Sequence, residues 1–231
     1  MKKLTIIMPV FNEGGLVTKS VRRVLALKLS GLEIELLIVN DGSTDETSRQ
    51  LKKIKDRRVT VINHGVNRGK GAAVTTALKK MTGDLTVIQD ADMEYDPNDL
   101  KLLLAPILDG RADVVFGSRF IGSGPHRVMY FWHYVANKLI TFFGDAFTNL
   151  NLSDMETGYK AFTKEVAKTI KLKEPRFSFD PEFTVKVAKA NFRVYEVGIS
   201  YAGRSYSEGK KIGLKDAIIA VWTIIKYSWF K

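Results

Sequence analysis

The chain has 231 residues, of which 45% are hydrophobic and 26% are charged, and its formal net charge at pH 7 is +11. This composition is typical of a globular protein with a sizeable core. The absence of cysteine excludes disulfides, thiolate metal sites and a cysteine nucleophile, and it suits a reducing compartment. No apolar run is long enough to cross a bilayer, and the positive charge predicts an anionic partner.

Short apolar runs alternate with helical patterns through the first half of the chain. Strands are predicted at 4–10, 34–39, 59–62, 85–89 and 112–117, with helices at about 17–25, 45–55, 71–81 and 97–108. Continuous apolar strands of this kind are buried on both faces of a parallel sheet. The alternation predicts a doubly wound α/β sheet, whose ligands bind at the carboxyl ends of its strands.

The alternation stops after Gly117. An aromatic-rich helical stretch at 129–150 is followed by a polar turn at 153–158. Asp180 and Pro181 have the pattern of an N-cap and first residue that open a helix reaching about Ala190. A late strand is predicted at 192–201, and a basic loop at 203–211 leads into a last helix at 214–230.

Polar segments follow the first four predicted strands. They are Phe11-Asn12-Glu13, Asn40 to Asp45, Asn67 to Gly71, and Asp90-Ala91-Asp92. Because strand ends meet at one edge of such a sheet, these segments can line one cleft. Asp90 and Asp92 can converge on Mg²⁺ or Mn²⁺, with substrate phosphates completing the shell. Taken alone, the Asp-x-Asp pattern has a high false-positive risk, and the second and third segments can equally be solvated turns or caps.

These four segments, in this order and spacing, resemble those of family-2 glycosyltransferases of the GT-A fold. The likeness is greatest to the branch that makes dolichyl-phosphate and polyprenyl-phosphate sugars, and segments 117–120, 154–160 and 179–182 extend it over nearly the whole chain. The resemblance implies a GT-A (Rossmann-like) doubly wound mixed sheet with helices on both faces and C-terminal amphipathic helices. It also implies one domain over 1–231, with a nucleotide-sugar-binding half at 1–118 and an acceptor-binding half at 119–231.

The resemblance further implies roles for residues at the strand ends. Those at the nucleotide-sugar donor are Pro9, Phe11, Glu13, Asp41, Lys70, Asp90, Ala91 and Asp92. Asp90, Asp92 and Glu94 would gather at the metal, although the related synthases often have Gln in place of Glu94, which is then either a ligand or a neighbour. A divalent cation suits this chemistry, because the departing nucleoside diphosphate develops negative charge.

On the acceptor side the resemblance implies that Arg119, Arg127, Arg204 and Lys210 meet a phosphate, which a guanidinium binds in fork geometry. The alternative is that these are solvated surface charges, above all Arg127. The residues expected to be catalytic are Asp92, Arg119 and Asp154. Asp154 can deprotonate a hydroxyl acceptor or orient the acceptor, since a phosphate monoester with a second pKa of about 6 scarcely needs a base.

Two stretches, 129–143 and 214–230, combine large aromatic residues with nearby Lys or Arg, as helices at a membrane surface do. They can equally be core helices or a homodimer face, because periodicity does not distinguish these. The net positive charge favours attraction to an anionic membrane leaflet. The basic residues are scattered, which argues against nucleic acid. We therefore expect a cytoplasmic protein that is peripheral at the membrane.

The sequence thus predicts an inverting, metal-dependent glycosyltransferase that moves a sugar from a GDP- or UDP-hexose to a polyprenyl (dolichyl) phosphate. One alternative is a glycosyltransferase acting on a sugar hydroxyl in cell-surface glycan synthesis. A sugar-phosphate nucleotidyltransferase is a second, but its usual Gly-rich opening is missing after the first strand. A non-catalytic nucleotide-sugar-binding module is a third, and the complete set of Asp90, Asp92 and Asp154 argues against it.

Overall fold

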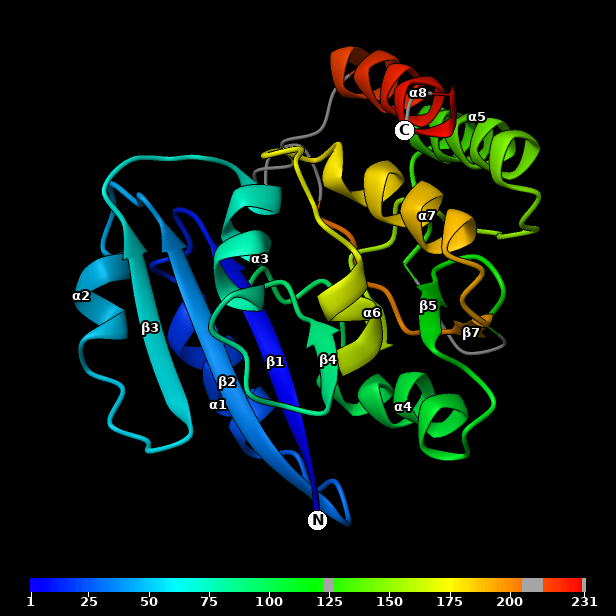
Figure 1. Ribbon diagram of the computed structural model, residues 1–231. Helices are drawn as coiled ribbons and strands as arrows, with labels where there is room; N and C mark the ends of the chain where they lie inside the picture. Colours follow the sequence, from blue (N-terminus) through cyan, green and yellow to red (C-terminus); the bar gives the residue numbers. More distant parts are fainter. Residues whose placement is uncertain (123–126, 205–213, 230–231) are drawn as a thin grey trace.

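The computed structural model describes residues 1–122, 127–204 and 214–229. At its centre is a seven-stranded sheet in the order β3-β2-β1-β4-β6-β5-β7 (Figure 1). The strands are β1 (Lys2–Val10), β2 (Leu32–Asp41), β3 (Val59–His64), β4 (Leu85–Ile88), β5 (Val114–Ser118), β6 (Lys160–Thr163) and β7 (Val194–Gly198). Only β6 runs antiparallel to its neighbours, so the predicted mixed sheet is confirmed.

Helices cover both faces of the sheet. On one face lie α1 (Val17–Leu25), α2 (Thr47–Leu51) and α4 (Leu100–Leu108), the last preceded by the short 3-10 helix η1 (Pro97–Asp99). On the other face lie α3 (Lys70–Leu78), α6 (Lys164–Thr169) and α7 (Phe179–Lys189). Alternate residues of β1 supply the two cores, as the pleat of a strand requires: Leu4 and Ile6 face the first helical layer and Ile7 faces the second.

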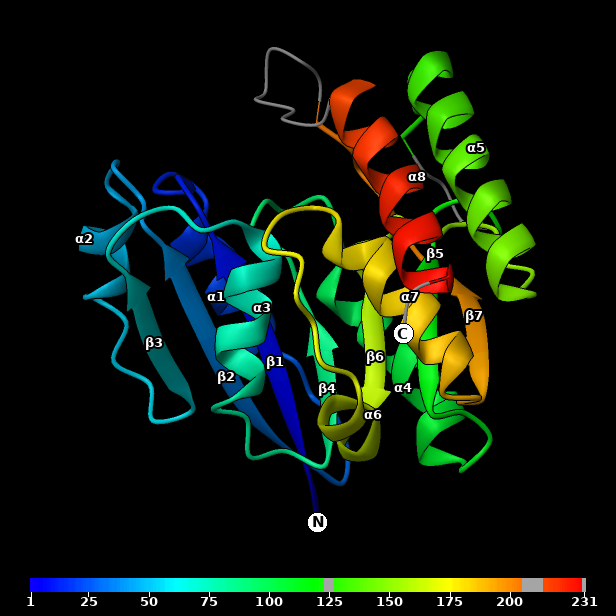
Figure 2. The ribbon, with the colours of Figure 1, turned by 45° about the horizontal axis from the view of Figure 1, so that its top comes forward.

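Two further helices, α5 (Phe131–Thr148) and α8 (Leu214–Trp229), lie side by side beyond α7 (Figures 1 and 2). A small third core, of Ile140, Met155, Val185, Ala220 and Ile224, joins them to α7. The two stretches predicted as helices with membrane or core roles therefore each have a buried side. Of the helices that the structure describes, none is long and apolar enough to cross a membrane.

The second half departs from the sequence prediction at β6, which was not expected. Its four residues begin with a lysine, Lys160, whose side chain is fully buried and whose ammonium group binds the carboxylate of Asp180. The prediction that Asp180 caps a helix is therefore wrong. Helix α7 begins at Phe179, two residues before the predicted first residue Pro181, so Asp180 lies inside the helix. Within the described part of the chain the N-cap residue Ser178 makes no side-chain cap bond.

The direction of β6 matters for function. The start of β6 lies beside the end of β4, since Ala161 pairs with Val87 and Thr163 with Leu85. The loop that precedes β6, residues 153–159, is thereby brought to the edge of the sheet where the parallel strands end. Helix α2 is shorter than predicted, and the loop predicted at 203–211 lies mostly outside the described residues.

Candidate active site

A cavity of about 750 Å³ opens at this edge of the sheet, and we refer to it as the main cavity. All residues predicted for the donor and the metal line it: Pro9, Phe11, Glu13, Asp41, Lys70, Asp90, Ala91, Asp92 and Glu94. Arg119 and Arg204 line it as well. The predicted convergence of the strand ends is therefore present in the structure, while the part that each side chain plays toward a substrate stays a prediction.

Asp41, at the end of β2, is buried and its carboxylate organises the loop that follows β3. It accepts hydrogen bonds from the side chain of Asn67 (3.0 Å) and from the backbone N–H groups of Arg68 (3.0 Å) and Gly69 (2.7 Å). His64 Nδ1 lies 2.6 Å from the same carboxylate. Both carboxylate oxygens thus have protein partners. Asp41 fixes the start of α3 and, with it, the position of Lys70 beside the cavity.

The acidic residues after β4 form ion pairs with two basic side chains. Lys70 Nζ lies 2.8 Å from Asp90 Oδ2. The guanidinium group of Arg204 lies 3.1 Å from Glu13, 3.2 Å from Asp92 and 3.2 Å from Glu94. Arg204 therefore spans three of the predicted donor and metal residues, a contact that joins segments more than a hundred positions apart.

The chemistry of the Asp90 and Asp92 carboxylates fits a divalent cation. Burial, and then the charges of Asp90 and Glu94, raise the pKa of Asp92 to about 7, which reflects negative charge gathered away from water. Hard carboxylate oxygens are the ligands that Mg²⁺ and Mn²⁺ prefer. Within the described residues no three acidic or histidine side chains lie close enough to hold an ion by themselves. An ion here would therefore need further oxygens, from water or from a substrate. The Glu94 carboxylate accepts a hydrogen bond from Tyr201 (2.8 Å).

Arg119 and Asp154, both predicted as catalytic, bind each other. Arg119 Nε and Nη2 each lie 2.7 Å from an oxygen of the Asp154 carboxylate, which is the two-pronged geometry of strong arginine–carboxylate pairs. A backbone N–H of Arg119 (3.0 Å) also donates to Asp154, and Asn137 on α5 accepts from the guanidinium group (3.0 Å). Asp154 is fully buried. This geometry favours an orienting role for Asp154 over proton abstraction.

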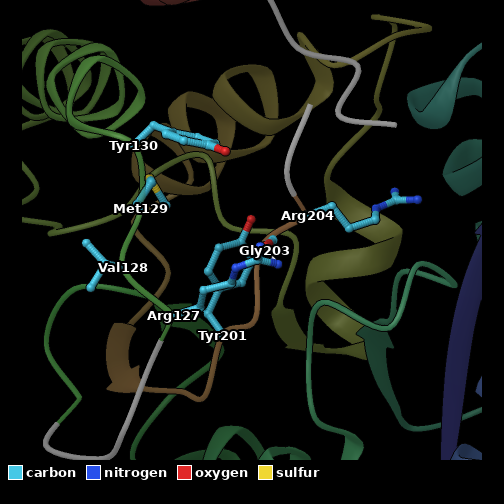
Figure 3. Close-up of a pocket in the computed structure, with 7 residues that line it drawn as sticks. All are labelled: Arg127, Val128, Met129, Tyr130, Tyr201, Gly203 and Arg204. Carbon is cyan, nitrogen blue, oxygen red and sulfur yellow. Dashed lines mark hydrogen bonds between the residues drawn. The ribbon is translucent and has the colours of Figure 1, made fainter. Parts of the chain in front are cut away.

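Two other predicted acceptor residues, Arg127 and Arg204, line a second, smaller pocket of about 250 Å³ (Figure 3). They line it together with Tyr130 and Tyr201, and Arg127 donates a hydrogen bond to the carbonyl oxygen of Gly203 (2.9 Å). In Figure 3 the Arg204 side chain points away from Arg127. Its guanidinium group contacts the Asp92 carboxylate of the main cavity. Arg204 thus lines both pockets. Lys210 lies outside the described residues.

Several residues that line the main cavity were not predicted as site residues, among them Tyr95, Asn137, Glu156 and Asp180. Glu156 and Asp180 stand within the segments that carry the family resemblance. The missing information was the strand β6, because without it the segment before Lys160 has no fixed place relative to the strand ends.

Helices α5 and α8 form one wall of the main cavity through Ala136, Ile140, Ala217 and Ala220. Trp132 also lines the cavity and is exposed. The two helices expose further large side chains: Phe131, Leu139, Phe142, Ile218, Trp222 and Trp229. Trp222 and Trp229 are 60% and 74% exposed, which is unusual for residues of this size. The site therefore adjoins an apolar surface.

Comparison with known proteins agrees with this geometry. Residues 5–171 match the family described as glycosyl transferase family 2. The chain is 27% identical to the dolichol-phosphate mannosyltransferase of Pyrococcus furiosus, over 91% of this chain and 60% of the relative's length. It is 26% identical to the UDP-N-acetylglucosamine–dolichyl-phosphate N-acetylglucosaminyltransferase of Methanococcus voltae, over 89% of this chain and 88% of that protein.

Among solved structures, the fold is similar to that of glucosyl-3-phosphoglycerate synthase from Mycobacterium tuberculosis in complex with Mn²⁺, uridine diphosphate and phosphoglyceric acid. The TM-score is 0.75 and the sequence identity 16%, over 100% of this chain and 80% of that chain. This likeness confirms the predicted GT-A fold. Because the family match spans most of the sequence, the chain belongs to glycosyl transferase family 2 and is a glycosyltransferase.

Proposed function

We propose that the chain transfers a hexose, with inversion, from a GDP- or UDP-sugar to a polyprenyl phosphate, and that it uses Mg²⁺ or Mn²⁺. One observation carries the proposal. A single cavity joins the carboxylates after β4 to Arg119 and to the apolar wall made by α5 and α8. The carboxylates suit the nucleotide sugar, Arg119 suits the acceptor phosphate, and the apolar wall suits an isoprenoid chain. The reaction needs these three features next to one another. The relatives named for transfer to dolichyl phosphate support it.

At the donor end, Pro9, Phe11 and Glu13 line the place where the nucleoside would lie. Asp90 and Asp92 would hold the cation, which would stabilise the negative charge of the departing diphosphate. Lys70 beside Asp90 adds positive charge at the same place. Lys70 is buried, which by itself lowers its pKa, yet the charges of Asp90 and Asp180 outweigh burial and raise that pKa, so the ammonium group stays protonated.

At the acceptor end, Arg119 is the cation that the structure holds most firmly, because Asp154 and Asn137 fix its guanidinium group. An acceptor phosphate is already ionised near neutral pH and can attack the anomeric carbon without a general base. The ion pair between Asp154 and Arg119 fits such an acceptor better than it fits a sugar hydroxyl, because a hydroxyl must lose a proton to a base.

The apolar surface of α5 and α8 supports a peripheral position at a membrane. Exposed Trp and Phe side chains are typical of helices that lie at the boundary between lipid headgroups and acyl chains. The net charge of +11 adds attraction to an anionic leaflet. An acceptor held in that leaflet would then reach the main cavity along the same two helices.

The test is transfer of radiolabelled sugar by the purified protein in the presence of Mn²⁺ and polyprenyl phosphate, across a panel of nucleotide sugars. Label is expected in the lipid phase, and it should be lost with a chelator or with Asp92→Asn. Glu165→Gln, an exposed acidic residue on α6, is the matched control and should transfer normally. Label that reaches only a soluble glycan would contradict the lipid acceptor.

A further inference from the structure

Three acid–base pairs each have at least one member that lines the main cavity: Lys70 and Asp90, Arg119, and Asp180. Asp90 pairs with Lys70 (2.8 Å), Asp154 with Arg119 (2.7 Å), and Asp180 with Lys160. Each carboxylate in these pairs has a cation of its own, so together they contribute little net charge. Glu156 lines the same cavity and forms no ion pair with the residues that the structure describes.

The loop that carries Glu156 is held firmly on both sides of it. The backbone N–H groups of Ser153 and Asp154 donate to the Glu196 carboxylate at 3.0–3.1 Å. On the other side, the N–H of Gly158 donates to the Tyr95 hydroxyl (2.8 Å). Side chains on such a fixed loop are well placed to recognise a ligand, because little conformational freedom remains to be lost on binding.

The same loop lies against the predicted cation site. A Cβ atom on Gly158 would stand 2.4 Å from Asp90 Oδ2, so the glycine is in direct contact with that carboxylate. Glu156, two residues earlier, therefore lies close to where a diphosphate and the sugar attached to it would be held. It lines the same cavity as the donor carboxylates and Arg119.

One oxygen of Glu156, Oε1, is shielded from solvent and has no hydrogen-bond partner among the residues that the structure describes. A buried polar atom left in this state costs free energy, and native proteins satisfy nearly all such atoms. A ligand in the cavity can satisfy this oxygen.

We propose that Glu156 binds a hydroxyl group of the sugar that is transferred, and that it selects neutral sugars over uronic acids. The inference rests on the proposed function, since it takes the cavity to hold a nucleotide sugar. A carboxyl group in its neutral form both donates and accepts hydrogen bonds, which matches a sugar hydroxyl. A uronic acid would bring a further carboxylate to a place where each cation is already paired.

The charges around Glu156 favour the neutral form. Burial, and then the charge of Asp180, raise the pKa of Glu156 to about 8, against the opposing effect of Lys160 and Arg119. Asp154, on the same loop, also raises this pKa. The carboxyl group is therefore largely protonated at pH 7 and loses its proton, and with it the ability to donate, as the pH rises through about 8.

The experiment compares the affinity of a nucleotide sugar with that of its own nucleoside diphosphate, by calorimetry with Mn²⁺. The probes are UDP with UDP-glucose and GDP with GDP-mannose, and the pair that binds the wild type more tightly is carried forward. The ratio of the two affinities isolates the sugar's contribution. The loss of one hydrogen bond to the sugar, as in Glu156→Ala, should lower this ratio about tenfold, while the affinity for the diphosphate alone stays unchanged.

Glu156→Gln should keep the ratio, because an amide also donates and accepts. In the wild type the ratio should fall as the pH rises from 7 to 9, and in Glu156→Gln it should stay level. Other groups that face the cavity, including Asp90, Lys70, His133 on α5 and Asp180 on α7, affect both ligands and cancel in the ratio. The uronic-acid counterpart of the chosen nucleotide sugar should gain no affinity over the diphosphate.

Two failures can be told apart. If neither UDP nor GDP binds the wild type, the proposed function is overturned and this inference with it. If a diphosphate binds but Glu156→Ala keeps the wild-type ratio, or the uronic acid binds as well as the neutral sugar, the role of Glu156 is overturned while the proposed function stands.

Discussion

Arg204 occupies the position that a cation would take among the carboxylates, and we predict that replacing it strengthens metal binding. Its guanidinium group contacts Glu13, Asp92 and Glu94 at 3.1–3.2 Å, and its side chain is only 19% exposed. A divalent ion that binds at Asp90 and Asp92 must displace at least part of this network. Arg204 therefore acts as a built-in competitor of the ion in the free protein.

The size of the effect follows from the number of contacts. Partly exposed ion pairs are each worth about 0.2–1 kcal/mol, so three of them together oppose the metal by roughly 2 kcal/mol. At about 1.4 kcal/mol for each factor of ten, Arg204→Gln should bind Mn²⁺ roughly 30-fold more tightly than the wild type.

The assay is titration of Mn²⁺ without nucleotide, followed by electron paramagnetic resonance, at pH 8. The pH matters because the pKa of Asp92 is raised to about 7, and loss of Arg204 raises it further, so protons compete with the metal at lower pH. In the wild type, Mn²⁺ affinity should accordingly increase as the pH rises through about 7.

The matched control is Arg193→Gln, because the guanidinium group of Arg193 binds Asp113 at the opposite edge of the sheet. Unchanged or weaker Mn²⁺ binding by Arg204→Gln at pH 8 would refute the reasoning.

Three further substitutions test other parts of the molecule. Gly158→Ala places a methyl group 2.4 Å from Asp90 Oδ2 and should displace the Asp90 carboxylate. We expect a loss of about 1–3 kcal/mol of stability and of most of the sugar transfer. Normal transfer would show that transfer does not require Asp90 at its present position. Lys160→Met leaves the buried Asp180 without its cation and should lower the free energy of unfolding in urea by about 3–5 kcal/mol. A loss below about 1 kcal/mol would mean that the pair is dispensable. Trp222→Ser should weaken sedimentation with anionic vesicles while leaving nucleotide affinity unchanged, and equal sedimentation would argue against lipid contact by α8.

The strands that hold the donor residues could be predicted because each is a mostly apolar run ending in polar residues. Leu4 to Val10 and Ile34 to Val39 are largely buried, and a mostly apolar run of this length is typical of a central strand in a parallel sheet. Their convergence on one cavity then followed from the geometry of a doubly wound sheet. The position of Asp90 and Asp92 was predicted on the same ground.

The contacts that join distant segments could not be predicted. Strand β6 has only four residues and begins with a buried lysine, so neither its length nor its pattern marks it as a strand. Without β6, Glu156 and the partner of Asp180 have no assigned place. The pairing of Arg204 with Glu13 spans 191 positions, and no local pattern carries information about it. Arg204 was therefore predicted as an acceptor residue, and its contact with the donor carboxylates emerged only from the fold.

The most direct test of the proposed transfer is the structure of the product. The purified protein would be incubated with a ¹³C-labelled nucleotide sugar, polyprenyl phosphate and Mn²⁺, and the lipid fraction studied by nuclear magnetic resonance. We predict a sugar joined to the lipid phosphate through its anomeric carbon, with the configuration opposite to that of the donor. A product with retained configuration, or free sugar with no labelled lipid, would contradict this mechanism.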